Sequence, residues 1–233
     1  MKRFFAATVL ALVTSVCSAQ EIQRPSDSRI MQFSERSGKN MYAVEDIFAI
    51  GWSEQGRFAY ATRTHVAGRG GTLFSYFVVS AVTDDILWKL DDDWPATNSV
   101  SIDQSMARNR AALLQMLDRY SIRQGRGTRL REFPLVAEGV QYRPKIAVKK
   151  KKEGHPFLGD IERVSLHILR SDGTQKTIFT NSDPGAFSYW TAGYFRSPYE
   201  PRILVAIGEQ VRGFEGTEGH FLFSGCSLRK GFE

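Results

Sequence analysis

The sequence predicts a mainly β (α+β) fold made of two antiparallel β-meanders with one amphipathic helix between them. Three observations lead to this prediction. Short apolar, aromatic and β-branched runs alternate with turn residues from residue 42 to 90, and a second such series runs from 140 to 228. Between them, only residues 101–122 show the spacing of a helix.

Residues 1–19 have the pattern of a cleavable secretory signal peptide. Lys2 and Arg3 give a positive start, and residues 4–16 are apolar apart from threonine and serine. A membrane-spanning helix needs about 20 predominantly apolar residues, so this run is too short to be one. The small residues Cys17 and Ala19 place the expected cleavage after Ala19.

Two alternatives compete with simple cleavage. A cysteine at the cut can be acylated, as in lipoproteins, but Thr-Ser-Val precedes Cys17 where a lipoprotein signal has Leu-Ala-Gly-like residues. A retained membrane anchor would need a second flanking signal. We therefore expect a periplasmic or secreted protein with no transmembrane segment after cleavage.

The composition is that of a globular protein with a mild positive charge. Hydrophobic residues make up 42% and charged residues 24% of the chain, which argues against long disordered segments. The chain has 31 basic and 25 acidic residues, and Lys2 and Arg3 of the signal peptide are among the basic ones. The positive charge suits an anionic surface or polymer of the cell envelope, whereas its scatter argues against nucleic acid.

Cys226 is the only cysteine left after cleavage, so no intramolecular disulfide can form. It lies among Phe221, Phe223 and Leu228 on an apparent strand. This setting predicts a buried apolar side chain, and a thiol that links to a partner is the alternative.

A polar lead-in at residues 20–40 is expected to precede a single mainly β domain at 41–233. The first meander has apolar runs at 44–52, 57–63, 72–82 and 85–90, separated by turns at 53–56, 68–71 and 83–85. In its second run, Phe58 and Tyr60 alternate with Ala59 and Ala61, which predicts one aromatic face.

Two turn-like segments invite a ligand-binding interpretation. Residues 68–71 (GRGG) have the glycines of a phosphate-binding loop, but a strand follows them instead of a helix, so a hairpin turn is favoured. The run Asp91, Asp92 and Asp93 lacks the alternating ligands and glycine of an EF-hand calcium loop. It is expected to form a solvated turn that leaves the first meander.

The helix is predicted to begin at Ser101, because Ser101 and Gln104 have the spacing of a capping box, and to end before Gly125. Four apolar side chains mark its buried face: Met106, Leu113, Leu117 and Tyr120. Four arginines are expected on its solvated outer face: Arg108, Arg110, Arg119 and Arg123.

The second meander has apolar runs at 140–148, 161–169, 176–181, 189–195, 202–211 and 220–228. Asp172-Gly173 lies between the second and third runs. This dipeptide favours a tight hairpin, because such turns need positive φ angles.

Residues 51–60 and 193–205 resemble each other: each has an aromatic residue, then a turn that begins with serine, then arginine and an apolar strand. The first segment is similar to the Trp-Ser-Pro-Asp-Gly-Lys hairpin of TolB-type β-propeller blades, although Glu54 and Gln55 stand where that motif has Pro and Asp. A propeller needs four or more blades, and the sequence contains two such similar segments. Two meanders built on related hairpins are therefore favoured over a full propeller.

The order of these features resembles a family of secreted bacterial proteins of unknown function. The resemblance rests on the hairpin at 50–61, the GRGG turn with the strand after it, the helix, and the stretch at 204–223. Its most specific element is GFEG at 213–216, which makes Phe214 and Glu215 candidate binding residues. The resemblance implies export and the fold, and it implies no activity.

No motif for catalysis, metal or cofactor binding stands out. His65, His155, His167 and His220 lack the short spacing at which two imidazoles bind one zinc ion. Serine-nucleophile motifs are missing, and Cys226 has no neighbouring histidine to activate it. A triad assembled from distant loops stays open, as does an acid–base pair of Glu215 and His220. We expect no metal and no cofactor.

Lys149, Lys150, Lys151 and Lys152 form the one concentrated charge. They are candidate ligands for phosphate, anionic lipid headgroups or an acidic partner. A hairpin tip or sheet edge that lysines keep soluble is the alternative.

The sequence thus favours a non-enzymatic binding or interaction module of the cell envelope. Its partner would be an unidentified envelope protein or an anionic surface, bound on the meander faces or on loops rich in Gly, Trp and Arg. The alternative is an exported hydrolase whose site is assembled from separate loops. A deep pocket lined by histidines and carboxylates would favour the hydrolase, and a shallow aromatic or basic surface would favour the binding module.

Overall fold

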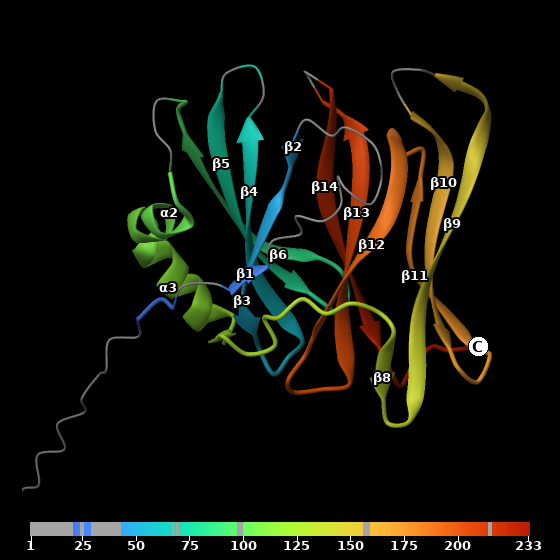
Figure 1. The fold of residues 1–233 in the computed structure, drawn as a ribbon. Helices are drawn as coiled ribbons and strands as arrows, with labels where there is room; N and C mark the ends of the chain where they lie inside the picture. Colours follow the sequence, from blue (N-terminus) through green and yellow to red (C-terminus); the bar gives the residue numbers. More distant parts are fainter. Residues whose placement is uncertain are drawn as a thin grey trace, which may run out of the picture.

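The structure, a computed structural model, describes residues 21–23, 26–28, 43–66, 68, 70–96, 100–155, 159–213 and 216–233. The described residues form three mainly antiparallel sheets and two short helices (Figure 1). The predicted signal peptide lies outside them. No helix in the described ranges is long and apolar enough to span a bilayer.

The helix-side sheet contains most of the predicted first meander. Its strands in spatial order are β1 (Ser26–Ser28), β3 (Asp46–Trp52), β4 (Arg57–Val66), β5 (Gly71–Ser80) and β6 (Ile86–Trp94), and β7 (Arg123–Gln124) also pairs with β3. The helices α2 (Ile102–Arg108) and α3 (Arg110–Arg119) follow β6.

The rest of the chain forms two further sheets. The outer sheet has the order β11 (Gln175–Ser182), β10 (Gly159–Arg170), β9 (Val140–His155) and β8 (Leu135–Ala137). The middle sheet has the order β12 (Ala186–Arg196), β13 (Arg202–Arg212), β14 (Thr217–Ser227) and β2 (Ala43–Val44), the last in parallel. The predicted second meander is therefore split between two sheets.

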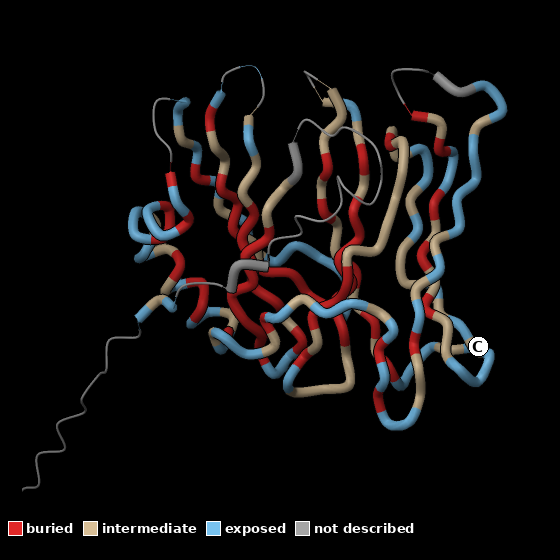
Figure 2. The backbone as a smooth tube through the Cα atoms, in the orientation of Figure 1, coloured by how far each residue is buried: buried red, intermediate tan, exposed pale blue. Residues whose placement is uncertain are grey.

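The helices and the three sheets are stacked as layers, and buried residues are concentrated on the strands between them (Figure 2). A separate apolar cluster fills each interface. One cluster joins the helices to the helix-side sheet. The second joins that sheet to the middle sheet, and the third joins the middle sheet to the outer sheet. The described strands form neither a closed barrel nor a propeller.

This layering explains the long apolar runs in the sequence. In β13, Ile203 and Val205 pack toward the outer sheet, whereas Leu204 packs toward the helix-side sheet. A strand that is covered on both faces reads as a continuous hydrophobic run. By contrast, β11 alternates exposed and half-buried residues, because one face of the outer sheet is open.

The predicted aromatic face of β4 is confirmed. Phe58 and Tyr60 lie in the cluster between the helix-side and middle sheets, and Ala59 and Ala61 lie under the helices. The hairpin turn at Asp172-Gly173 also forms, with Gly173 at a φ of +90°.

The prediction of one helix was wrong, because two helices meet at Asn109. The capping box of Ser101 and Gln104 is present as expected. At Asn109, however, ψ is 13°, and the side-chain Nδ2 donates to the Ser105 carbonyl at 3.0 Å. Asparagine competes in this way for a carbonyl of the preceding turn, which interrupts the helix.

The prediction of a solvated turn at Asp91–Asp93 was also wrong, because these residues belong to β6. Alternation along the strand leaves Asp91 and Asp93 exposed or half-exposed and turns Asp92 inward, where it is 3% exposed. Asp92 accepts hydrogen bonds from Ser105 Oγ at 2.5 Å and from Trp94 Nε1 at 2.8 Å.

Arg108 completes this buried cluster. Its guanidinium pairs with Asp92 and lies over the Trp94 ring, 4.0 Å from the centroid. Arg108 was expected on a solvated helix face and instead fastens α2 to the edge strand of the sheet. Burial opposes ionisation of Asp92, but its hydrogen bonds outweigh burial, and the pKa of this carboxyl is lowered.

Cys226 is a buried side chain, as predicted. It is free and fully buried between the middle and outer sheets. Burial raises the pKa of its thiol to about 11, so the thiolate is scarce at neutral pH.

Candidate anion-binding site

A basic strap, residues 123–131, crosses the ends of the helix-side and middle sheets on its way from α3 to the outer sheet (Figure 1). Its backbone is hydrogen-bonded at both ends. The Gly125 amide donates to the Ile50 carbonyl at 2.9 Å, and Arg131 and Tyr194 exchange two backbone bonds of 2.9 and 2.8 Å. The strap is therefore held on ordered strands.

Glycines allow the strap to lie flush against the sheets. A Cβ atom on Gly51 would lie 2.2 Å from the Arg123 carbonyl oxygen, and one on Gly193 would lie 2.4 Å from the Arg131 oxygen. Gly127 has a φ of +65°, and its own Cβ would lie 2.5 Å from the Arg196 oxygen. Each of these distances is too short for any side chain, so the close approach depends on glycine.

Trp52 fixes the middle of the strap. Its side chain is fully buried, and its Nε1 donates to the Gly127 carbonyl at 3.1 Å. The indole has one donor, and this bond satisfies it.

Four strap side chains are exposed arginines: Arg123, Arg126, Arg129 and Arg131. Within the part of the chain that the structure describes, no carboxylate forms an ion pair with them. The strap thus presents guanidiniums that no ion pair within the described residues engages, on a backbone that is already ordered.

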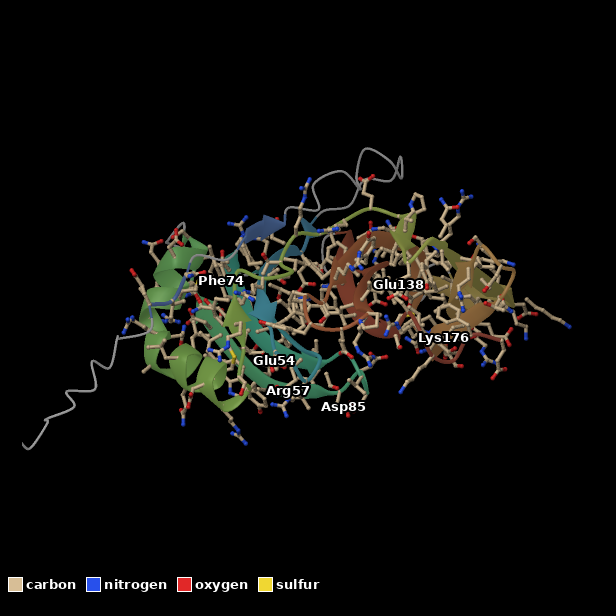
Figure 3. All side chains as sticks on the ribbon, turned by 90° about the horizontal axis from the view of Figure 1, so that it is seen from below. Glu54, Arg57, Phe74, Asp85, Glu138 and Lys176 are labelled. Atoms are coloured by element: carbon tan, nitrogen blue, oxygen red, sulfur yellow. The ribbon has the colours of Figure 1, made fainter. Side chains whose placement is uncertain are left out.

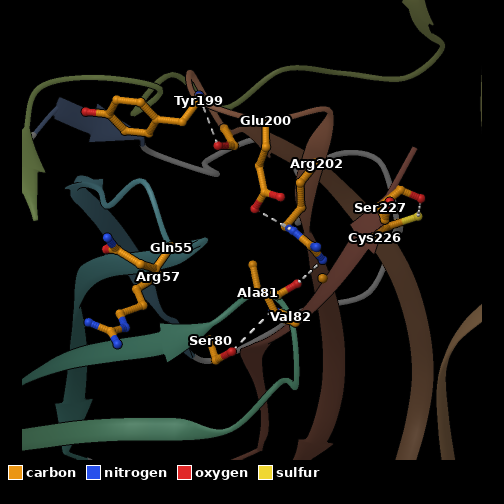
Figure 4. Close-up of polar contacts among 12 residues, drawn as sticks. Gln55, Arg57, Ser80, Ala81, Val82, Tyr199, Glu200, Arg202, Cys226 and Ser227 are labelled. Carbon is orange, nitrogen blue, oxygen red and sulfur yellow. Dashed lines mark hydrogen bonds and ion pairs between the residues drawn. The ribbon is translucent and has the colours of Figure 1, made fainter. Parts of the chain in front are cut away.

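The two hairpins that resemble each other in sequence lie beside the strap and are built alike. Ser53 and Ser197 are both buried, and each hydroxyl accepts the backbone N–H two residues ahead at 3.3 Å. In the second hairpin, Arg202 pairs with Glu200 at 2.7 Å and donates to the Ala81 carbonyl at 2.8 Å (Figure 4). This arginine therefore ties the middle sheet to the helix-side sheet.

Two hollows flank the strap, and Tyr199 lines both. The first has a volume of about 550 Å³ and is lined by Glu21, Gln23, Glu54, Arg123, Gln124, Arg126 and Tyr199. The second has a volume of about 530 Å³, and its charged lining residues are Arg131, Glu138, Arg196, Glu200 and Arg229. Figure 3 labels Glu54 of the first hollow and Glu138 of the second.

The charges of the first hollow balance, with two arginines against two glutamates, whereas internal ion pairs leave the second hollow with a surplus of positive charge. Glu138 pairs with Arg229, which lowers the pKa of its carboxyl, and Glu200 pairs with Arg202. The guanidiniums that remain belong to Arg123, Arg126, Arg131 and Arg196, and the carboxylates that remain belong to Glu21 and Glu54. An anionic group would find donors here that no ion pair within the described residues occupies.

The lysines singled out in the sequence lie elsewhere, on β9 of the outer sheet. Lys149, Lys150 and Lys151 pair with Glu162, Asp160 and Asp183 respectively. Beyond Tyr142, no described strand pairs with the second edge of β9, so these lysines follow a sheet edge. Phe214 and Glu215 lie outside the described residues.

The histidines do not line either hollow. His220 lies 3.4 Å from Glu218, and His167 contacts the Thr177 hydroxyl at 2.9 Å. Glu45 lies near His220, and burial raises the pKa of its carboxyl. Among the described residues, no group of three His, Cys, Asp or Glu side chains is arranged to hold a metal ion.

Sequence reasoning missed the strap arginines as a site. Residues 119–131 contain five arginines and no carboxylate, which was the available signal. The sequence pattern assigns Arg119 and Arg123 to a helix face and leaves the other three arginines in a connection with no predicted element. The five positive charges therefore do not stand out as one group.

A scan against models of protein families and searches of curated proteins and of solved structures found no match to this chain. The fold and the site define a class of protein: a layered antiparallel β protein with an arginine-rich strap across the ends of two sheets. The resemblance to a secreted bacterial family stays a prediction.

Proposed function

We propose that this chain is an exported, non-enzymatic binding module of the cell envelope that holds an anionic ligand on its basic strap. The observation that carries the proposal is the pair of hollows with guanidiniums that no ion pair within the described chain occupies. Export rests on the signal-peptide pattern of residues 1–19.

The chemistry of arginine supports this choice of ligand. A guanidinium offers five donors in a planar fork that matches carboxylate and phosphate groups. It stays charged at any pH the protein meets. Because the strap backbone is fastened at Gly125, Gly127 and Arg131, binding costs less ordering entropy than binding to a loose loop.

The lining of the hollows favours binding over hydrolysis. Both are open, are lined by arginine, glutamate and tyrosine, and contain no histidine. His220, Glu218 and Glu45 form a separate cluster on other residues. A general base next to a nucleophile would be needed for the hydrolase alternative.

The double variant Arg126→Ala/Arg131→Ala is expected to lose anion binding. A hydrogen bond to a charged group contributes about 1.5–3 kcal/mol, so loss of both guanidiniums should weaken binding at least about 100-fold. Binding of polygalacturonate and of inorganic polyphosphate to the full chain would be measured by calorimetry at physiological ionic strength.

The matched control is Lys149→Gln/Lys150→Gln, which removes the same net charge from β9. We expect it to bind nearly as the wild type does, because these lysines are engaged by Glu162 and Asp160. Equal losses in the two double variants would mean that only the overall charge attracts the polymer, and a strap site would be refuted.

Export has its own test. Native protein purified from its host is expected to begin at Gln20, as read by N-terminal sequencing. Native protein that retains Met1 in a cytosolic fraction would contradict export and leave the strap chemistry unaffected.

A further inference from the structure

The two hollows are neighbours, because Tyr199 lines both. The strap runs past them in order, with Arg123 and Arg126 at the first hollow and Arg131 at the second. One extended ligand can therefore meet cationic groups on both sides of Tyr199. A ligand with a single acidic group would use only part of this surface.

The hollows also contain hydrogen-bond acceptors, which a bare polyanion would not need. Glu54 and Glu21 line the first hollow beside its arginines, and Glu138 lies in the second. Carboxylates repel a chain that consists of phosphates alone. They accept hydrogen bonds from hydroxyl groups, however, and guanidiniums bind the acidic groups of the same ligand.

The Tyr199 ring adds an apolar surface between the charged groups. The residue is half-buried and packs partly against the apolar cluster between the helix-side and middle sheets. Its hydroxyl is buried and has no hydrogen-bond partner among the described residues, so its contribution to a ligand would come from the ring. An aromatic side chain offers a rigid contact for the apolar face of a cyclic unit.

From this arrangement we infer that the strap binds an acidic oligosaccharide, a chain of carboxylate-bearing sugars that spans both hollows across Tyr199. This inference rests on the proposed function and names its ligand class. Sugar hydroxyls pair with the glutamates, sugar carboxylates pair with the strap arginines, and a sugar ring lies against Tyr199.

The test is a length series of galacturonate, from the monomer to the hexamer, titrated into the full chain by calorimetry. Two contacts joined in one ligand act at high effective concentration. We therefore expect the hexamer to bind about 100-fold more tightly than the monomer. A methyl-esterified hexamer, which lacks the charges, and inorganic polyphosphate are expected to bind more weakly than the acidic hexamer.

Variants at Tyr199 test the ring. Tyr199→Phe keeps the ring and removes an unpartnered hydroxyl, so hexamer binding is expected to stay within about twofold of the wild type. Tyr199→Ala is expected to weaken hexamer binding about tenfold, and its cooperative thermal unfolding shows whether the variant is folded.

The outcomes separate this inference from the proposed function. If polyphosphate binds as tightly as the acidic hexamer, the saccharide class is wrong and an anion-binding strap stands. If all lengths of galacturonate bind alike, a ligand that spans both hollows is wrong. If no anion binds, both the inference and the proposed function fail.

Discussion

Replacing Gly127 by alanine is expected to lower the free energy of unfolding by about 2–5 kcal/mol. Alanine at a φ of +65° costs about 1–2 kcal/mol by itself. Its Cβ would also lie 2.5 Å from the Arg196 oxygen and 2.8 Å from Trp52, so the strap must move outward. The Trp52 Nε1 bond to the Gly127 carbonyl is then lost in a buried setting, at about 1–3 kcal/mol.

The chain offers a matched control for this substitution. Gly139 has nearly the same backbone conformation, with a φ of +76°, and nothing lies within 4 Å of the position its Cβ would take. Gly139→Ala is therefore expected to cost only the conformational term of about 1–2 kcal/mol. Urea denaturation of both variants measures the difference, and equal losses would show that the strap does not press against the sheets.

Movement of the strap also predicts a functional effect of Gly127→Ala. Arg126 and Arg131 flank Gly127, and the two hollows depend on their placement. Polygalacturonate binding is expected to fall together with stability, whereas Gly139→Ala keeps it. If the destabilised Gly127→Ala chain binds polygalacturonate as the wild type does, binding does not depend on how closely the strap lies against the sheets.

Asp92→Asn is expected to destabilise the protein by about 2–4 kcal/mol. The carboxylate is the shared acceptor for Ser105, Trp94 and Arg108, and an amide cannot accept from all of them. Removing one partner of a buried ion pair typically costs about 3–5 kcal/mol. The cost is smaller here, because the half-exposed Arg108 guanidinium can be hydrated once its partner is lost. Chemical denaturation at neutral pH measures the loss.

Asp118→Asn on α3 is the control, because Asp118 is exposed and no hydrogen bond or ion pair within the described chain engages its side chain. A change within about 0.5 kcal/mol is expected there. A similar loss of stability in both variants would show that Asp92 contributes through its negative charge alone and not through its hydrogen bonds.

The Asp92 contribution is also expected to depend on pH. The pKa of this carboxyl is lowered in the folded protein, so its stabilisation is fully present above the unfolded-state pKa of about 3.9. It is lost as the pH falls through the folded-state pKa. The stability difference between wild type and Asp92→Asn should therefore narrow below about pH 4, and a difference that stays constant would contradict this assignment.

Local features of the sequence predicted local features of the structure well. The capping box at Ser101, the hairpin at Asp172-Gly173 and the aromatic face of Phe58 and Tyr60 depend on neighbours within a few residues. The burial of Cys226 followed from the apolar residues around it. Each of these predictions needed only the periodicity or chemistry of one segment.

The candidate site could not be predicted in the same way. Tyr199, Arg126 and Arg131 are brought together by glycine contacts and backbone bonds between segments that are distant in sequence. Arg126 and Arg131 stood out only as a local concentration of positive charge. The position of that charge depends on the strands that hold the strap, which are β3 near Gly125 and β12 at Arg131.

By itself, the sequence determined that this chain is mainly β and where most of its strands and turns lie. Only the tertiary structure decided that the second meander divides into two sheets, that Asp92 faces inward, and that the arginines of the strap flank Tyr199. The physical reason is that side-chain periodicity specifies the faces of a strand, whereas layer order and side-chain placement depend on which distant faces pack together.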